Sequence, residues 1–178
     1  MGDVVAKATE PALAAIKLAW WRERLEELDE DRVPAEPRLQ AAATELLSRG
    51  LSGASLAELE EGWAALLDER PDNERVLARG ARLFAMAANL LCAADPLIET
   101  AGRLYGRQSA SRRGFALPPS GDEPRSLAGH RFAHRLRPLT ALAALAARDA
   151  RRGRAMEPEG TPGRALALIR HRLTGRVS

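Results

Sequence analysis

Helix signals follow one another along the whole chain while strand signals are almost absent, and this contrast limits the fold more than any other feature. Apolar residues recur at helical spacing, as at Leu13, Ile16 and Trp20. Proline and glycine, for example Pro11 and Gly50, stand where such segments would begin and end. The sequence therefore predicts an all-α fold, a single bundle of about seven or eight helices.

The expected helices are separated by turns rich in Pro, Gly and Asp. They lie near residues 11–30, 37–47, 56–67, 74–93, 98–105, 138–154 and 164–174. Ser55 and Glu58 have the spacing of a capping box at the start of the third helix. The long irregular stretch 109–124 is expected to be a mobile connection. The length of 178 residues is that of one domain, so we expect residues 1–178 to form a single domain, and no internal repeat is found.

The composition predicts a core of leucine and alanine. Of the 178 residues, 35 are alanine and 4% are aromatic, and alanine-rich helices pack closely. The single cysteine, Cys92, excludes an internal disulfide framework, and its apolar neighbours predict a small buried side chain. No apolar run approaches the roughly 20 residues that cross a bilayer, and no secretory signal is recognisable. We therefore expect a cytoplasmic protein, with a peripheral position at the inner membrane as an extension of that prediction.

Charge divides the chain into an acidic first part and a basic second part. Residues 1–102 carry 11 Lys and Arg against 19 Asp and Glu, whereas residues 103–178 carry 16 against 5. The basic part could bind nucleic acid or an anionic membrane surface, or it could dock on the acidic part or on an acidic partner. The arginines are not interleaved with aromatic side chains for base stacking, and no groove-reading motif is recognisable, so the pattern does not favour nucleic acid.

The final helix, 164–174, is basic and amphipathic. Its apolar residues are Leu166, Leu168, Ile169 and Leu173. We expect these side chains to pack on the bundle. Peripheral contact of this helix with a membrane surface is the alternative.

The acidic residues that follow the first helix do not have the arrangement of a magnesium site. Magnesium requires carboxylates that converge on one point. Asp29 and Asp31 are two residues apart and diverge on a helix. Glu26 and Glu30 are four apart, but such a pair at a charged helix end is typical of solvated surface. We therefore expect no metal ligand among them.

Histidine and tryptophan offer two further candidates. His130 and His134 are four residues apart and could hold zinc on a helix. No glutamate lies between them as in a metalloprotease, so the pattern favours a basic helix face. Trp20 and Trp21 diverge by about 100° on a helix, which favours a helix packed on two sides inside a bundle. The alternative is that they line an apolar ligand cavity.

Residues 10–39, EPALAAIKLAWWRERLEELDEDRVPAEPRL, resemble the squalene/phytoene synthase family, and most of all its small proteobacterial members, which are akin to the complex I assembly factor branch. The later stretches ARGARLFAMAANLL, AGRLYGRQSASRRG, LRPLTALAALAARD and EPEGTPGRALALIRHRLTG fit the same relatives. The resemblance implies an isoprenoid-synthase-like helical bundle around a central cavity. It also implies a chain that is short at its N-terminus.

The chain departs from this family at its acidic motifs. Active members carry two Asp-rich motifs that hold magnesium and prenyl diphosphates. Upstream of the Trp pair, where the first would lie, only Asp3 and Glu10 are acidic. The second would lie near AGRLYGRQSASRRG, which has four arginines and no acid. Without a metal ion to take up the charge of the leaving diphosphate, catalysis of that kind is not expected.

We therefore expect a non-catalytic scaffold, without a cofactor, that binds a protein partner or an apolar, isoprenoid-like ligand. One alternative is an active prenyltransferase that uses magnesium and displaced acids such as Glu26, Asp29 and Glu30. A second alternative is an Arg-rich protein that binds anionic surfaces. If an N-terminal helix is missing, an apolar groove beside the first helix would favour a homo-oligomer.

Overall fold

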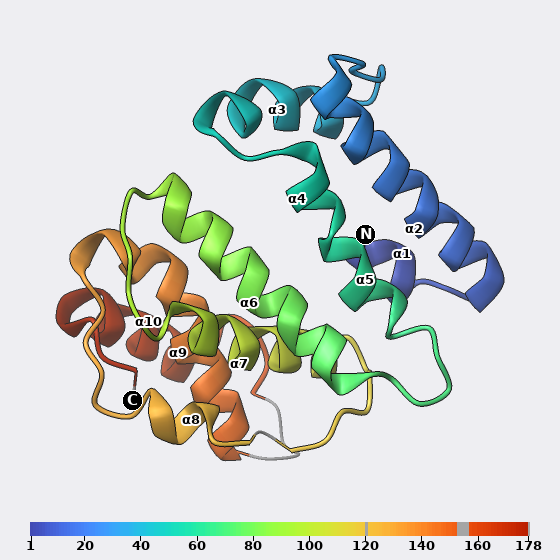
Figure 1. Ribbon diagram of the computed structural model, residues 1–178. Coiled ribbons are helices and arrows are strands. Elements are labelled where there is room, and N and C mark those ends of the chain that lie inside the picture. The colour runs from blue at the N-terminus through green and yellow to red at the C-terminus, as the bar shows by residue number, and fades with distance from the viewer. Residues whose placement is uncertain (120, 153–156, 178) are drawn as a thin grey trace. The chain divides into compact units, whose positions relative to one another are not determined.

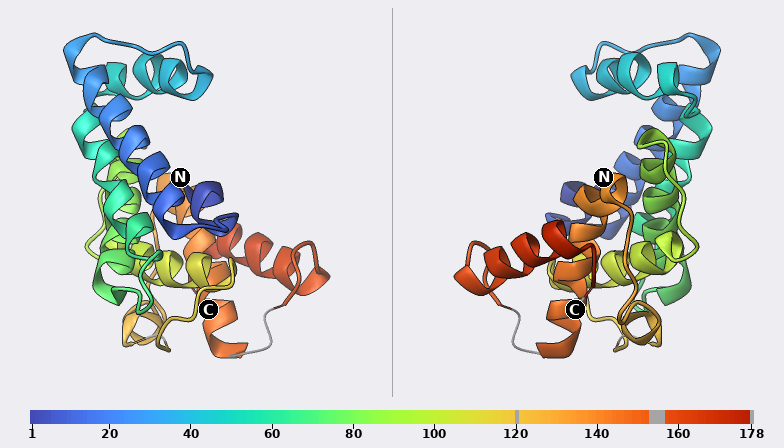
Figure 2. Two further views of the ribbon diagram at one scale, coloured as in Figure 1. Left: turned by 90° about the vertical axis from the view of Figure 1, so that its right-hand side faces the viewer. Right: turned by 90° about the vertical axis from the view of Figure 1, so that its left-hand side faces the viewer.

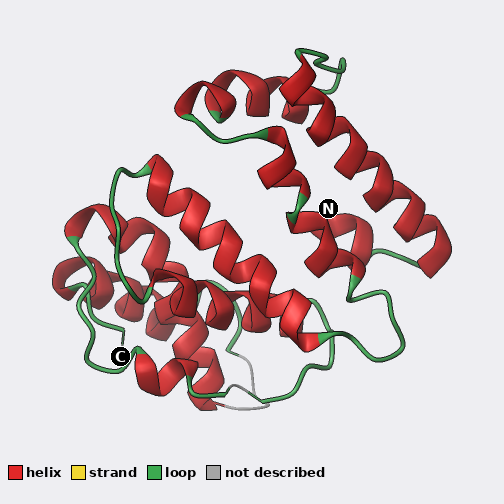
Figure 3. Cartoon of the chain, viewed as in Figure 1, coloured by secondary structure: helices red, strands yellow, loops and turns green. Residues whose placement is uncertain are grey.

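The regular structure of the described residues, 1–119, 121–152 and 157–177, is helical in this computed structural model (Figure 1, Figure 3). Within these residues the only β pairing consists of two isolated bridges. The predicted all-α class is therefore confirmed. Contacts divide the chain into two compact units, Met1–Arg79 and Gly80–Ser178, which are described separately. That residues 1–178 act as one domain stays a prediction.

The first unit is built from short helices and one longer one. They are α1 (Gly2–Ala6), α2 (Pro11–Glu26), α3 (Pro37–Glu45), α4 (Gly53–Ala57), α5 (Leu59–Ala64) and the first turns of α6 (Asn73–Leu90), with 3-10 turns at Glu27–Glu30 and Leu47–Arg49. Prolines begin α2 and α3 in their first turn, as the sequence predicted. The apolar cluster of this unit has Leu25, Leu28, Leu39 and Ala57 at its centre.

The predicted capping box at Ser55 is wrong. Ser52 caps the helix instead, because its Oγ accepts a hydrogen bond from the backbone N–H of Ser55 at 3.0 Å. Helix α4 therefore begins at Gly53, two residues before the predicted cap, and Ser55 lies inside it. Serine is a common N-cap residue, so Ser52 and Ser55 were both candidates. The capping-box spacing between Ser55 and Glu58 favoured Ser55, which is not the cap.

The prediction that both tryptophans lie inside a bundle is wrong for Trp20. The Trp20 side chain is 42% exposed. Leu13 and Ile16, on the same side of α2, are 47% and 67% exposed. Trp21 packs beside the cluster of Leu25 and Leu28 and meets the Trp20 ring edge-on at 5.2 Å between centroids. Helix α2 therefore buries one flank and leaves an apolar stripe on the other.

The second unit is a group of longer helices. It contains the rest of α6 together with α7 (Ile98–Ser111), α8 (Glu123–Ser126), α9 (Arg137–Arg152) and α10 (Pro162–Thr174), and a 3-10 turn at His134–Leu136. Helix α9 packs against both α7 and α10 (Figure 2). The apolar core between them centres on Phe84, Leu104, Phe132, Leu136 and Ala143, and it contains the many alanines that the composition predicted.

Two glycines set the approach of α6 to α7. A Cβ at Gly80 would collide with the carbonyl of Gly102 and would lie 2.9 Å from the Cα of Gly106. Only glycine leaves room for the two backbones to come this close. This contact fixes the position of α7, the helix that carries much of the cavity described below.

Cys92 is exposed, and the prediction of a buried thiol is wrong. The cysteine has a φ of 49°, the left-handed conformation that follows many helix ends. The N–H of Ala93 bonds to the carbonyl of Ala88, and the N–H of Cys92 to that of Asn89. This pair of bonds is the Schellman arrangement that closes α6, and it turns Cys92 outward despite its apolar neighbours.

The irregular stretch predicted at 109–124 is shorter in the structure, because α7 continues to Ser111 and α8 begins at Glu123. Ser120 lies outside the described residues. The Nη1 of Arg107 donates to the carbonyl of Pro118 at 2.7 Å, which ties this stretch to α7. Its mobility stays a prediction. No described helix is both long enough and apolar enough to cross a membrane.

Candidate functional site

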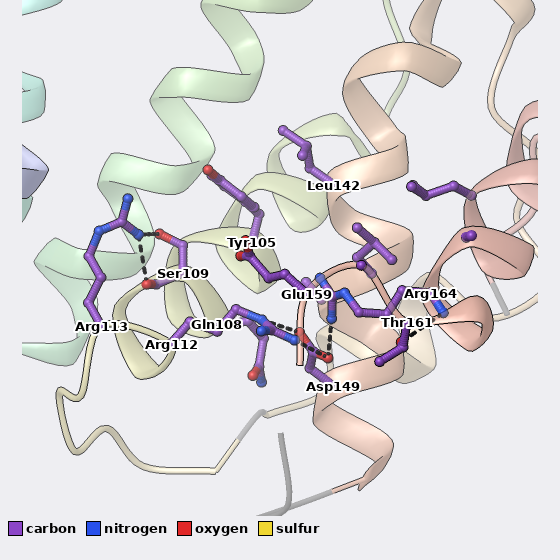
Figure 4. A pocket seen from close by; sticks show the side chains of 15 residues that line it. Tyr105, Gln108, Ser109, Arg112, Arg113, Leu142, Asp149, Glu159, Thr161 and Arg164 are labelled. Atoms are coloured by element: carbon purple, nitrogen blue, oxygen red, sulfur yellow. Dashed lines mark hydrogen bonds and ion pairs between the residues drawn. The ribbon is translucent and has the colours of Figure 1, made fainter. Parts of the chain in front are cut away.

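A cavity of about 530 Å³ opens in the second unit, and three helices each present one face to it (Figure 4). Each face has residues at positions i, i+3, i+4 and i+7, the spacing of one side of a helix. The faces are Tyr105, Gln108, Ser109 and Arg112 on α7; Leu142, Leu145, Ala146 and Asp149 on α9; and Thr161, Arg164, Ala165 and Leu168 on α10 with its cap. Arg113, Glu159 and Gly160 complete the lining.

A cluster of one carboxylate and two guanidinium groups closes one end of the cavity. Asp149 is only 2% exposed and receives two hydrogen bonds from Arg112, at 2.7 and 2.8 Å. The Nη1 of Arg164 donates to the same carboxylate at 2.7 Å. A forked Arg–carboxylate pair is among the strongest and most directional contacts in proteins. The cluster therefore joins α7, α9 and α10 at one point.

The cavity has a polar end and an apolar end. Leu142 and Asp149 lie on the same face of α9 and are separated by two turns, or about 10 Å along the axis. Arg112 and Arg164 lie beside Asp149, whereas Leu142 lies away from it, toward the other end of the cavity (Figure 4). Side chains at the polar end can hold a charged group, whereas Leu142 and Leu168, 41% and 37% exposed, offer an apolar surface that a ligand could cover.

The turn before α10 forms part of the polar end. Thr161 caps the helix, and its hydroxyl donates to Glu157 at 2.6 Å. Arg148 donates to the other Glu157 oxygen at 2.6 Å. These two hydrogen bonds, from Arg148 first and then Thr161, lower the pKa of the Glu157 carboxyl to about 2. The turn is also tied to α7, because Arg112 donates to the Glu157 carbonyl at 3.0 Å.

The charge balance of the lining favours an anion. The lining contains three arginines, Arg112, Arg113 and Arg164, and two carboxylates, Asp149 and Glu159. The N-terminus of α10, with its partial positive charge, lies at the same end. The cavity is of the size that small-molecule sites have, and a few convergent polar groups over apolar walls are typical of them.

Three of the acids considered as magnesium ligands, Asp29, Glu26 and Glu30, have another partner. Asp29 accepts hydrogen bonds from the backbone N–H groups of Gly53 and Ala54 at 2.6 and 2.8 Å, which begin α4. Glu26 pairs with Arg22 at 3.1 Å, and Glu30 pairs with Arg32. Among the residues that the structure describes, no group of three or more His, Cys, Asp or Glu side chains could hold a metal ion.

The two histidines do not share a helix, so the predicted basic helix face is wrong. His130 lies before the 3-10 turn that His134 begins, and its Nε2 lies 2.9 Å from the carboxylate of Asp95. Between them the chain is not helical: Arg131 forms an isolated bridge with Arg176, and Phe132 is fully buried in the core. His134 is exposed at the start of the turn.

The third histidine, His171, is buried on the inner side of α10. Its Nε2 lies 2.9 Å from Thr140 Oγ1 and its Nδ1 lies 2.9 Å from the Arg176 carbonyl. Burial lowers the pKa of His171. No pattern in the sequence pairs His171 with Thr140 or with Arg176, which are 31 and 5 positions away from it.

The basic residues singled out in the sequence fall into different roles. Arg112, Arg113 and Arg164 line the cavity. Arg170 and Arg172 are exposed on α10, and Arg176 follows it. In the run RRGR, Arg151 and Arg152 end α9, whereas the remaining two residues, 153 and 154, lie outside the described residues.

Sequence reasoning missed the residues that line this cavity, although the family resemblance implied a central cavity. The i, i+3, i+4, i+7 spacing on three segments was present in the sequence, and it could have marked each face. Periodicity does not say which faces meet, however, because that depends on contacts such as Arg112 to Asp149, 37 residues apart. Comparison of the chain with family models, with curated proteins and with solved structures finds no match.

Proposed function

We propose that this chain is a non-catalytic binding protein whose second unit takes an elongated apolar ligand with one anionic end group. The observation that carries the proposal is the two-ended cavity, with arginines around Asp149 at one end and leucines at the other. An apolar tail between Leu142, Leu145 and Leu168 would leave water, while the head group would meet the excess of guanidinium charge.

The resemblance to squalene/phytoene synthases supports an isoprenoid-like ligand. The stretch AGRLYGRQSASRRG, where that family would hold its second acidic motif, is α7 and the turn after it, and it lines the cavity with Arg112 and Arg113. Arginines can bind a phosphate ester directly, without a metal ion between them. The proposal is therefore a ligand of prenyl phosphate type, bound and not transformed.

Calorimetric titration tests this proposal with three probes: farnesyl phosphate, farnesol and inorganic phosphate. Farnesyl phosphate should bind with a Kd of roughly micromolar size. Farnesol should bind about tenfold more weakly because it lacks the charge. Inorganic phosphate alone should show no binding, and a metal chelator should change none of these results.

A variant that fills the cavity shows where the ligand binds. Ala165→Trp places a large side chain in the lining of α10 and should abolish binding. Ala41→Trp, at an exposed alanine of α3 in the other unit, is the matched control and should bind normally. Equal binding of farnesyl phosphate by both variants, or no binding by the unaltered protein, would refute the proposal.

The non-catalytic part has a separate test. Purified protein incubated with farnesyl diphosphate and magnesium should release no diphosphate. Magnesium-dependent turnover that is lost in Asp29→Asn would favour the alternative of an active prenyltransferase with displaced acids.

A further inference from the structure

Helix α10 has its polar side chains inside and its large apolar side chains outside. On the inner side, Arg164 is 8% exposed and bonded to Asp149, and His171 is 1% exposed and paired with Thr140. Arg137 from α9 donates to the carbonyls of Arg172 and Leu173 at the end of the helix. Ion pairs and hydrogen bonds therefore hold α10 to the unit. Most of the large apolar side chains of the helix are not buried in this contact.

The outer side of α10 is an apolar stripe of Leu166, Ile169 and Leu173. These side chains are 66%, 57% and 71% exposed, and their spacing of three and four residues places them on one side of the helix. The prediction that they pack on the bundle is therefore wrong. Single exposed apolar side chains are common on protein surfaces. Three of them in one stripe on a 13-residue helix indicate a surface that a membrane or another molecule covers.

Arginines flank this stripe on both sides. At about 100° per residue, Arg170 projects roughly 70° to one side of the stripe's centre and Arg172 roughly 90° to the other. Both are exposed, and α10 contains no acidic residue. When such a helix lies on a bilayer, the apolar residues enter the acyl layer, and long cationic side chains at the borders of the apolar face extend to the lipid phosphates.

From this arrangement we propose that the outer side of α10 is an interfacial surface that docks on an anionic lipid bilayer. The charge of the second unit supports this occupant, since residues 80–178 carry 17 Lys and Arg against 7 Asp and Glu, a net charge of +10. The contact would be peripheral, with the helix lying in the plane of the surface.

The neighbouring charges favour an anionic surface over a second copy of the chain. Burial and then the like charges of Arg148 and Arg170 lower the pKa of Arg151, so these three arginines lie near enough to repel one another. If two copies met through the same stripe, Arg170 and Arg172 would face the same cations of the partner. Anionic head groups would relieve this repulsion and a second copy would increase it.

Vesicle sedimentation tests the proposal with the full chain. Vesicles of mixed phosphatidylglycerol and phosphatidylcholine should bind the protein, and vesicles of pure phosphatidylcholine should bind it at least about tenfold more weakly. Binding should fall as salt rises from roughly 50 to roughly 200 mM, because the Debye length shortens. A failure to bind anionic vesicles, or equal binding to neutral ones, overturns the proposal.

Two variants and a matched control assign the contact to the stripe. Leu166→Gln/Ile169→Gln/Leu173→Gln should reduce vesicle binding about tenfold or more, with an unchanged thermal unfolding curve because these positions are exposed. Arg170→Gln/Arg172→Gln should weaken binding about tenfold and flatten its salt dependence. Leu13→Gln/Ile16→Gln, at apolar positions of α2 that are similarly exposed, should bind vesicles normally.

The alternative occupants give different results. If the stripe covers a second copy, the unaltered protein will form dimers in sedimentation velocity runs that the triple glutamine variant abolishes, and vesicles will not bind. Equal loss of vesicle binding in the α2 control would also overturn the proposal, since it would show general adhesion of apolar surface. The ligand titration of the cavity is independent, because none of the three stripe residues lines it.

Discussion

Asp149 is the most consequential single side chain of the second unit. Substituting Asp149→Asn keeps the shape of the side chain but removes the charge that Arg112 and Arg164 share. The amide nitrogen of the new side chain would also face a guanidinium group, where both partners are donors. The substitution therefore leaves two cations close together without their counterion.

The size of the effect follows from the burial of the three groups. Removing one partner of a buried ion pair costs about 3–5 kcal/mol, because the remaining charge is left without compensation. The Arg164 side chain is 10% exposed and cannot rehydrate, whereas Arg112 at 20% can do so in part. We therefore expect Asp149→Asn to lower the free energy of unfolding by about 3 kcal/mol, near the lower end of that range.

Urea unfolding followed by circular dichroism measures the loss, and hydrogen exchange of amides in α7, α9 and α10 assigns it to this unit. Arg22→Gln, which breaks the exposed pair with Glu26, is the control and should cost less than about 1 kcal/mol. Replacing all three members by apolar residues, with Arg112→Met/Asp149→Leu/Arg164→Met, should restore most of the stability. A cost below about 1 kcal/mol for Asp149→Asn would refute the buried cluster.

Three further predictions concern stability. Because the folded protein lowers the pKa of Glu157 from 4.5 to about 2, the carboxylate stabilises the fold above pH 4.5 and loses this effect as pH falls toward 2. The free energies of unfolding of the wild type and of Glu157→Gln should therefore differ at neutral pH and converge as pH falls from 4.5 toward 2. Burial lowers the pKa of His171, so the unfolded chain binds the proton at a higher pH than the folded one, and stability should fall as pH drops below about 6.5. In His171→Asn the stability should not show this dependence on pH. The same pH dependence in both proteins would count against the prediction. Gly80→Ala should destabilise the protein by about 1–3 kcal/mol in thermal unfolding, since its methyl group has no room beside Gly102; a neutral result would show that α6 and α7 are further apart.

Local signals in the sequence predicted the helices well. Proline in the first turn, as at Pro11 and Pro37, is a chemical feature of a single helix end, and it needs no tertiary information. The errors arose where two local signals competed. Ser52 and Ser55 could both cap, and the apolar run around Cys92 hid the left-handed turn that ends α6.

The cavity and the exposed stripes could not be predicted in this way. Periodicity identifies an apolar face but not what it meets, so Leu166 and Ile169 looked like core residues. In the structure, α10 is oriented by polar contacts to Asp149 and Thr140, which are remote in the sequence. The sequence left open whether the arginines bind an outside partner or dock within the chain, and in the structure Arg112 and Arg164 both pair with the buried carboxylate of Asp149.

Methyl-resolved NMR during titration with farnesyl phosphate shows whether an apolar ligand with an anionic head binds in the cavity of the second unit. We expect saturable shifts of the methyl groups of Leu142, Leu145 and Leu168, which line the cavity, and none at Leu25 or Leu39 in the first unit. Shifts confined to the first unit, or no saturable shifts at all, would contradict this expectation.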